Sequence, residues 1–529
     1  MPQKKVTYVS LLADESIHES YEKALAAVKK KLGQHHPMFI GDSGLFTKEE
    51  FEVRSPIDSG ILIGYFQKAN GEDARRAVAH AKSAFLSWSL TDWKERVRII
   101  RTAADTLSRQ MFTLAALITY EVGKNRYEAV AEVSEAIDFL RYYADLYEAH
   151  GGFITPMVSE IPGESCVSVL RPHGVWAVIS PFNFPIALAA GMAGAALIAG
   201  NTVVLKPTSL APLSGLKLYQ AFISSGIPPG VVNAVTGPGE AFGDVVTAHP
   251  DVDGIAFTGS RDVGIWLARR FAAKQPYAKP VVSELGSKNP CIVTDNADIE
   301  KAVEGIVRAA FGYGGQKCSA TSRVYVQEGI AGRFTEALAK RVSGLVVGDP
   351  RAKDAFIGPV INQQALDRFT AAVREAREMG GTILTGGEEL TKKPFMNGFY
   401  ATPTLVTGIP RDHRLFKDEL FVPFVVVDTF STLQEALSFA NDTEYGLTAG
   451  IFSEEQDETD YFFEHIRFGV CYANRSGGAT TGAWPGAQPF GGWKASGATG
   501  KGAGGPWYLL SYLREQAQTR VTGEKGPKA

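Results

Sequence analysis

The spacing of hydrophobic and polar positions changes near Gly174. Before that point apolar residues recur at helical intervals, which predicts a leading helix around Tyr21 to Leu32 and three later long helices over residues 73–88, 93–109 and 126–150. A strand-like pair, Phe51–Arg54 and Gly60–Phe66, separates the leading helix from the others. The first part of the chain is therefore predicted to be mainly helical.

After Gly174, short β-rich runs alternate with segments of helical length. The runs are Val175–Ile179, Thr202–Leu205, Val231–Val235, Ile255–Phe257 and Val281–Ser283. Such alternation predicts βαβ units and a parallel sheet with helices on both faces. Ligands bind beyond the carboxyl ends of the strands in such sheets. Polar residues or glycines just past these strands are expected at one edge: Asn183, Lys206, Gly237, Ser260 and Glu284.

A second alternating region runs from about Asn289 to about Tyr472, with helices predicted near 299–310, 332–341 and 365–379. It indicates a second α/β domain. The segment Gly152–Leu170 is β-like and is expected to form a hairpin outside both domains, and the apolar tail Trp507–Val521 is expected to pack on another surface.

Composition narrows the functional class. The 529 residues are 45% hydrophobic and 21% charged, with a net charge of -3, so a multidomain globular protein is expected and a nucleic-acid binder is disfavoured. The start of the chain has no apolar signal region, and its longest apolar stretch is too short to span a membrane. Few, scattered cysteines without a C-x-x-C pair indicate a reducing cytoplasm and no metal site.

Cys318 is the strongest candidate for a nucleophile. It follows Gly312-Tyr313-Gly314-Gly315-Gln316-Lys317, and glycines allow backbone N–H groups to approach a thiol in a narrow pocket. Lys317, or a helix start at this point, would favour the thiolate. A buried, inert cysteine is the alternative for Cys318 and the expected state of the other three, Cys166, Cys291 and Cys471.

Two further side chains complete a candidate catalytic set. Glu284 ends a buried strand, where partial burial would raise its pKa and suit a general base for a hydrolytic water. Asn183, in Ser180-Pro181-Phe182-Asn183-Phe184-Pro185, could donate its amide to a developing oxyanion. The alternatives are a salt-bridged strand-end glutamate and a turn-forming asparagine.

Glycine turns indicate phosphate binding. Phe257-Thr258-Gly259-Ser260 precedes Val263-Gly264 at a predicted helix start, where backbone N–H groups favour an anion. Gly237-Pro238-Gly239 with Gly243 forms a second such turn. Neither is the G-x-G-x-x-G fingerprint of dinucleotide-binding folds.

Together these motifs resemble the aldehyde dehydrogenase superfamily over nearly the whole chain. Further matching motifs are Leu205-Lys206-Pro207, Gly348-Asp349-Pro350, Gly358-Pro359, Glu419–Pro423, Tyr445–Thr448 and Pro489–Gly492. The resemblance implies an α/β fold: a Rossmann-type parallel-sheet cofactor domain, an α/β catalytic domain and a small β oligomerisation element. The boundaries expected are 1–151 with 171–286, then 287–473, and 152–170 with 500–525.

The resemblance also implies roles for individual residues. Cys318 is the nucleophile, Glu284 the general base, and Asn183 with the Cys318 N–H the oxyanion donors. The implied cofactor is NAD, with Lys206 and Glu419 at its riboses, Phe421 at the nicotinamide and Ser260 at the pyrophosphate. The remaining residues of the implied cofactor set are Ser180, Phe182, Ser209, Gly239, Gly243, Gly259 and Leu285.

The chain departs from the usual family pattern at three positions. Ser209 stands where many NAD-specific members have a glutamate, so use of NADP as well as NAD is open to this protein. Ser287 replaces the second glycine of the usual Glu-Leu-Gly-Gly, which tightens the turn near the base, and Val422 replaces a common glycine.

Within the superfamily the chain most resembles the 1-pyrroline-5-carboxylate dehydrogenases, which oxidise L-glutamate γ-semialdehyde to L-glutamate in proline degradation. The resemblance lies in 33–41, Glu121–Asn125, Glu135–Phe139 and Gly482–Gly492. It implies a substrate site made by Phe184, Ser319, Gly482, Ala483 and Phe490.

The alternatives are an aldehyde dehydrogenase for another semialdehyde or an aliphatic aldehyde, and a CoA-acylating enzyme, which retention of Glu284 disfavours. A non-catalytic protein on this fold is disfavoured because Cys318, Glu284 and Asn183 are all present. A homo-oligomer without nucleic-acid or membrane partners is expected.

Overall fold

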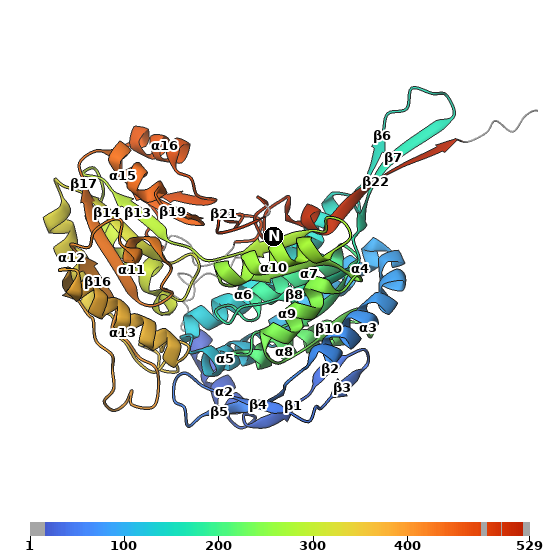
Figure 1. The fold of residues 1–529 in the computed structure, drawn as a ribbon, viewed down its shortest axis with the longest axis horizontal. Coiled ribbons are helices and arrows are strands. Elements are labelled where there is room, and N and C mark those ends of the chain that lie inside the picture. Colours follow the sequence, from blue (N-terminus) through green and yellow to red (C-terminus); the bar gives the residue numbers. More distant parts are fainter. Residues whose placement is uncertain (1–15, 478–483, 499, 522–529) are drawn as a thin grey trace, which may run out of the picture.

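The computed structural model describes residues 16–477, 484–498 and 500–521. Its elements form two α/β lobes, one from blue to green and one from yellow to orange in Figure 1, and a narrow sheet that projects away from both. The α/β class expected from the sequence is confirmed, and each lobe contains one seven-stranded sheet.

The first lobe is built on a seven-stranded sheet in the order β12-β11-β8-β9-β10-β2-β3. Its first five strands are parallel neighbours, and β2 and β3 add antiparallel at one edge. The bounds are β12 Val281–Glu284, β11 Val252–Thr258, β8 Val175–Ile179, β9 Thr202–Lys206, β10 Val232–Ala234, β2 Met38–Ile40 and β3 Ser43–Leu45. The five predicted strands are therefore present, with ends shifted by a few residues at most.

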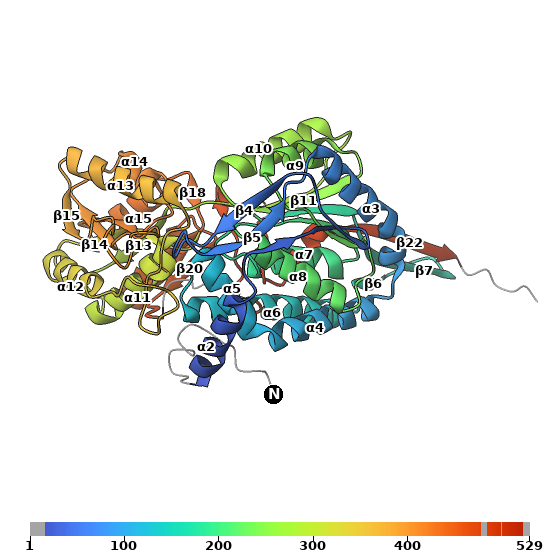
Figure 2. The ribbon, with the colours of Figure 1, turned by 90° about the horizontal axis from the view of Figure 1, so that it is seen from below.

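Helices cover this sheet, and Figure 2 shows them from a second direction. The central strands of the sheet, and the helix α7, consist largely of apolar or small residues that are fully buried. A parallel sheet between two helical layers requires such residues. The helices are α2 Ser16–Lys29, α3 Gly71–Leu90, α4 Trp93–Arg109, α5 Met111–Val122, α6 Arg126–Ala149, α7 Ala187–Ile198, α8 Pro212–Ser224, α9 Gly239–Ala248 and α10 Arg261–Lys274.

The second lobe has its own seven-stranded sheet, ordered β15-β16-β17-β14-β13-β19-β20, parallel apart from the edge strand β15. The strands are β13 Asn289–Val293, β14 Thr321–Gln327, β15 Thr382–Thr385, β16 Thr404–Thr407, β17 Phe424–Phe430, β19 Thr448–Phe452 and β20 Val470–Ala473. The helices are α11 Ile299–Phe311, α12 Ala331–Ser343, α13 Gln363–Glu378, α14 Arg414–Lys417, α15 Leu433–Asn441 and α16 Gln456–His465, with the 3₁₀ turn η1 Gly312–Gly315.

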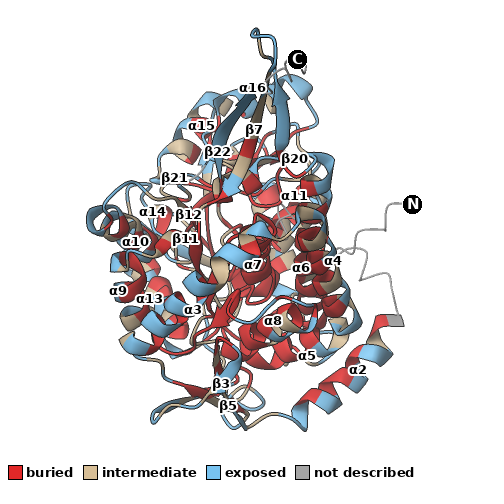
Figure 3. Cartoon of the chain, turned by 90° about the vertical axis from the view of Figure 1, so that its right-hand side faces the viewer, coloured by how far each residue is buried: buried red, intermediate tan, exposed pale blue. Residues whose placement is uncertain are grey.

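Three small sheets complete the fold. The projecting one pairs β22 Leu513–Val521 with β7 Glu164–Pro172 and β7 with β6 Ile154–Met157, all antiparallel. Figure 3 shows this sheet largely in the exposed colour, whereas α6 and α7 are mostly buried. The other two small sheets are β1 Gln34–His36 with β5 Leu62–Gln67 and β4 Glu50–Arg54, and β18 Tyr445–Gly446 with β21 Trp493–Lys494; the 3₁₀ turn η2 Tyr508–Tyr512 precedes β22.

Within the described residues, no helix is long and apolar enough to cross a membrane. Nor does that part of the chain hold a group of three or more His, Cys, Asp or Glu side chains arranged for a metal ion.

Candidate active site

The nucleophile candidate Cys318 lies where two cavities adjoin. One cavity, of about 560 Å³, opens at the carboxyl edge of the first sheet and has Asn183, Lys206 and Cys318 in its wall. The other, of about 30 Å³, is lined by Cys318 together with Glu284. The sulfur is thus shared by a cavity large enough for a cofactor and a small one beside the carboxylate.

Most residues expected to bind the cofactor line the larger cavity. They are Ser180, Phe182, Lys206, Ser209, Gly239, Gly259, Ser260, Leu285, Glu419 and Phe421. Gly243 does not: it lies in α9, where an added Cβ would stand 3.1 Å from the Trp266 ring of α10. Its physical role is close packing of the two helices.

The N-terminus of α10 has the features of an anion site. Ser260 is its N-cap residue, but its side chain makes no capping hydrogen bond, so the first N–H groups of the helix face the cavity edge without that competitor. An added Cβ at Gly264 would stand 2.2 Å from Leu285, so the helix can approach the strand end only with glycine there.

Two charged side chains line the larger cavity: Lys206 is buried and Glu419 is partly exposed. Burial lowers the pKa of Lys206 to about 8, and its ammonium donates to the Pro207 carbonyl at 3.0 Å. Burial raises the pKa of Glu419 to about 7, and the Ser287 N–H donates to its Oε1 at 2.7 Å. An ammonium with spare donors and a carboxylate with spare lone pairs suit the hydroxyl groups of sugars.

Phe421 shows backbone strain at the cavity wall. Its φ is 58°, a left-handed value that an aromatic residue rarely adopts, and its ring meets the Phe182 ring edge-on at 5.9 Å. Such strain persists where the surroundings fix it, and it commonly marks a functional position.

Glu284 is held deep in the protein at the end of β12. Its side chain is 7% exposed, and burial raises its pKa well above the ordinary value, while the Gly492 N–H, which donates to it at 3.1 Å, lowers it. Within the described residues this carboxylate forms no ion pair, in contrast to the salt-bridged alternative. A buried carboxylate with a raised pKa can accept a proton near neutral pH.

Lys317 does not serve the thiolate as the sequence suggested. Its ammonium lies 2.7 Å from both carboxylate oxygens of Glu128 in α6, in an ion pair that is almost fully buried. Burial instead raises the pKa of the Cys318 thiol, and nearby carboxylates of Glu419, Glu284 and Glu135 raise it further. The pairing was not predictable because Lys317 and Glu128 are 189 residues apart.

The smaller cavity holds the described part of the expected substrate site. Phe184, Ser319 and Phe490 line it, together with Glu135, Met192 and Tyr508, which sequence reasoning did not assign. Glu135 lies in the motif Glu135–Phe139, on which the resemblance to the subfamily partly rests. That motif is the signal in the sequence that pointed to Glu135. Gly482 and Ala483 lie outside the described residues.

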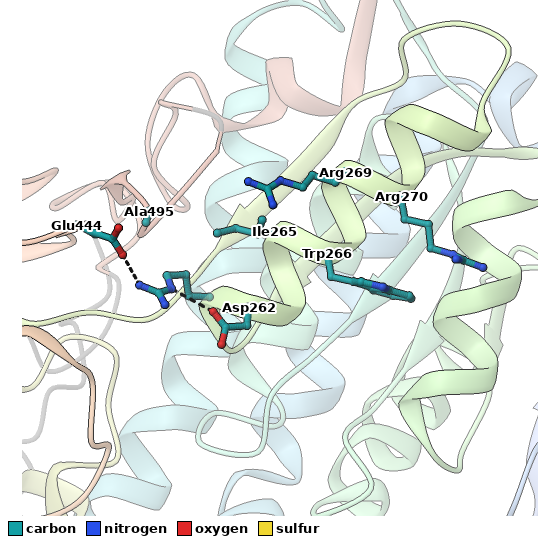
Figure 4. A pocket seen from close by; sticks show the side chains of 8 residues that line it. Asp262, Ile265, Trp266, Arg269, Arg270, Glu444 and Ala495 are labelled. Atoms are coloured by element: carbon teal, nitrogen blue, oxygen red, sulfur yellow. Dashed lines mark hydrogen bonds and ion pairs between the residues drawn. The ribbon is translucent and has the colours of Figure 1, made fainter. Parts of the chain in front are cut away.

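A further cavity, of about 750 Å³, opens over the outer side of α10 (Figure 4). There the Arg261 guanidinium pairs with Glu444 at 2.5 Å and with Asp262 at 3.1 Å. The cavity is larger than the others, but no nucleophile or buried carboxylate lines it, so the chemistry belongs to the cavities around Cys318.

Comparison with known proteins agrees with this geometry. A family model described as "Aldehyde dehydrogenase family" matches residues 46–517. The chain belongs to the aldehyde dehydrogenase family. Among curated relatives, the 1-pyrroline-5-carboxylate dehydrogenase of Geobacillus sp. (strain WCH70) is 38% identical over 509 residues, which are 96% of each protein.

Solved structures of aldehyde dehydrogenases give the same result. A 1-pyrroline-5-carboxylate dehydrogenase from Thermus with bound NAD superposes with a TM-score of 0.91 at 34% identity, covering 96% of this chain and 97% of that one. Proline utilization A (PutA) from Bdellovibrio bacteriovorus gives 0.92 at 36% identity. This chain covers 53% of the PutA chain, so it spans about half of that protein.

Proposed function

We propose that this aldehyde dehydrogenase oxidises L-glutamate γ-semialdehyde, the open form of 1-pyrroline-5-carboxylate, to L-glutamate in proline degradation, with NAD as the hydride acceptor. The observation that carries the proposal is the position of Cys318, whose side chain is shared by the cofactor-sized cavity and the small cavity of Glu284. The names of the relatives and structural neighbours supply the substrate.

The residues divide the reaction between them. The Cys318 thiolate adds to the aldehyde carbon, and the Asn183 amide and the Cys318 N–H stabilise the negative oxygen. NAD held by Lys206 and Glu419 would supply the acceptor for the hydride of this carbon. The thioester remaining on Cys318 is then attacked by water, Glu284 takes the water's proton, and the acid leaves as the thiolate is restored.

The cavity fits a dinucleotide. Glu419 and Lys206 offer a sugar an acceptor and a donor, and an added Cβ on Gly286 would stand 2.4 Å from the Glu419 carboxylate, so glycine permits the approach of that side chain. The Ser180 hydroxyl, buried at the same cavity, has no hydrogen-bond partner among the residues that the structure describes. The residues present therefore suit the group.

We also propose that NADP can replace NAD. The Ser209 hydroxyl donates to the Gly237 carbonyl at 2.7 Å, and Glu419 is the one acidic residue among those lining the described cavity. No carboxylate beside Ser209 would repel a 2′-phosphate. The ratio of kcat/KM for the two cofactors measures this preference.

The polar groups that line the small cavity match those of an amino-acid semialdehyde. Glu135 provides a carboxylate for the α-ammonium group, and Ser319 provides polar groups beside the nucleophile. The part of the proposal that assigns the substrate carboxylate to Gly482 and Ala483 concerns residues outside the described ranges.

Steady-state kinetics test the function. We expect kcat/KM for L-glutamate γ-semialdehyde to exceed that for succinate semialdehyde and for simple aliphatic aldehydes, because only the first carries the α-ammonium group. Equal or better use of the simple aldehydes would refute the substrate assignment. NADH formation that requires added CoA would instead indicate a CoA-acylating enzyme.

We further propose that the protein is a cytoplasmic homo-oligomer. Its cysteines are free thiols, as a reducing compartment favours. The projecting sheet exposes apolar side chains that a second copy could cover: Ile154, Met157, Val158 and Ile161 in and after β6, and Val521 in β22.

A further inference from the structure

Ser287, which stands where the family usually has a glycine, links the cofactor cavity to the nucleophile. It lies between the strands β12 and β13 and is 4% exposed. Its backbone N–H donates to Glu419 at 2.7 Å, and its hydroxyl donates to the carbonyl oxygen of Cys318. Ser287 therefore contacts both Glu419, which is expected to bind a ribose of the cofactor, and the backbone of the nucleophile Cys318.

A second side chain strengthens this contact. The Asn289 amide donates to the same Cys318 carbonyl at 2.8 Å, to the Ala320 carbonyl at 2.9 Å and to the Ser287 hydroxyl at 2.8 Å. Its own oxygen accepts the Thr448 N–H at 2.9 Å, which fixes the orientation of the amide. Asn289 is fully buried, so these hydrogen bonds are shielded from solvent.

The peptide group that accepts these hydrogen bonds also contacts the sulfur. The Cys318 carbonyl belongs to the peptide that joins Cys318 to Ser319, and the Ser319 N–H of that peptide donates to the Cys318 sulfur. A hydrogen bond accepted at the carbonyl of a peptide polarises it and makes its N–H a stronger donor. A stronger donor stabilises the thiolate more than the thiol.

We propose that Ser287 is a positioning residue for the reaction: through its hydroxyl it fixes and polarises the Cys318–Ser319 peptide, so that the Ser319 N–H stabilises the Cys318 thiolate. The inference rests on the proposed function only in taking Cys318 as the nucleophile. Because Ser287 also holds Glu419 through its backbone, the same residue aligns the cofactor side of the site with the sulfur.

The surroundings of the sulfur explain why such support matters. The charged groups that face it are carboxylates from three different parts of the fold, Glu419 before β17, Glu284 at the end of β12 and Glu135 in α6. The nearest cation in sequence, Lys317, is paired with Glu128. The Ser319 N–H is therefore a donor that favours the thiolate against these carboxylates.

The pH dependence of alkylation tests this directly. The full-length enzyme, without substrate, is treated with iodoacetamide across a pH series, and modification of Cys318 is followed by peptide mass spectrometry. We expect Ser287→Ala to shift the Cys318 titration to higher pH and to slow alkylation at fixed pH by about threefold, the size of one modest hydrogen bond. In steady state kcat should fall by a similar factor with little change in KM for NAD.

Two further variants make the result decisive. Ser287→Thr keeps the hydroxyl and should restore the titration, whereas Ser287→Gly should behave as Ser287→Ala does. Ser225→Ala is the matched control, because this buried serine donates to the Ala221 carbonyl at 2.6 Å in α8, outside the residues that line the cavities. It should leave the titration unchanged.

The proposal is overturned if Ser287→Ala alkylates and turns over like the wild type, or if Ser225→Ala shifts the titration equally. Failure of the proposed function is a different result: the wild type would then not oxidise the semialdehyde, while the alkylation shift in Ser287→Ala would still be observed.

Discussion

Glu284 shows at the level of one residue how function opposes stability. Its carboxylate is buried at the end of β12 and accepts a hydrogen bond from the backbone N–H of Gly492. Removing a charge from water without an ionic partner costs free energy, which appears as a raised pKa. The same burial makes the ionised Glu284 carboxylate a stronger base than an exposed one, as the proposed role in hydrolysis requires.

Glu284→Gln is therefore expected to stabilise the fold at alkaline pH. The folded-state pKa of Glu284 lies above the unfolded value, so the stability of the wild type falls as pH rises between these two values and stays lower above them. The Tm of the variant should exceed that of the wild type at pH 8, and the difference should vanish towards pH 4. Scanning calorimetry across this range is the measurement, and a lower Tm for the variant at pH 8 would contradict the burial argument.

Sequence motifs predicted which candidate residues would lie together better than they predicted the contacts around them. Cys318, Asn183 and Lys206 lie in motifs whose residue types suggested their chemistry, and the structure brings all of them to one cavity. The partner of Lys317 could not be predicted, since Glu128 reaches it from a helix far away in the sequence. Tertiary contact, not local sequence, decided the state of that charge.

At the level of elements, α6 is the clearest departure from a simple sequence pattern. Its apolar face, which includes Ala129, Val133 and Leu140, was predicted and is buried. Its acidic positions Glu128, Glu132 and Glu135 are buried too, because they face the loops of the active site rather than solvent. An amphipathic pattern predicts one buried face and gives no sign of a second.

Glu132 ties two of those loops together. It accepts the Ile186 N–H at 2.9 Å, just after the Asn183 motif, and pairs with Lys124 at 2.7 Å. The Lys124 ammonium lies 3.4 Å from the centre of the Phe184 ring and 5.0 Å from that of Tyr313, before the nucleophile. The helix thus supports both the asparagine loop and the cysteine loop.

Removing one charge of the Lys124–Glu132 pair should lower the free energy of unfolding more than removing both charges. Glu132→Gln leaves Lys124 buried without an anionic partner, for which we expect a loss of about 3–5 kcal/mol in the free energy of unfolding. Lys124→Met combined with Glu132→Gln should recover much of it, since no unpaired charge remains. Urea unfolding measures both.

Glu121→Gln serves as the control for these variants. Glu121 is equally buried, but it binds the first N–H groups of α8, and burial raises its pKa to about 7. A neutral amide there should cost little. The account of the pair is wrong if the double variant is less stable than Glu132→Gln alone.

At the scale of the whole molecule, the alternation of strands and helices predicted both parallel sheets but not how they meet. The Leu285 N–H donates to the Ser496 carbonyl at 2.8 Å, and Phe490 lines the cavity of Glu284. The segment around Gly492 that covers Glu284 thus comes from about 200 positions later in the chain. The helix α5 and the strands β1 to β3 were also not predicted, because short or uniformly apolar runs have little periodicity.

The projecting sheet supplies the prediction for the assembly. Met157 and Val158 are 54% and 92% exposed, so lysine at both positions should not harm the fold of one chain, but it should weaken an apolar interface. We expect the molar mass by light scattering to fall towards that of a single chain. Leu86→Lys, at an exposed site on α3, should leave the mass unchanged. A wild type that already has the mass of one chain would contradict the proposed oligomer.

The covalent step is the centre of the account, and trapping it is the most direct measurement. Glu284→Gln is mixed with L-glutamate γ-semialdehyde and NAD, quenched and analysed by peptide mass spectrometry. The account predicts one rapid burst of NADH and a glutamyl mass on the peptide of Cys318, because hydride transfer proceeds while hydrolysis stalls. Continued turnover at the wild-type rate, or acylation of Cys166, Cys291 or Cys471 in place of Cys318, would contradict it.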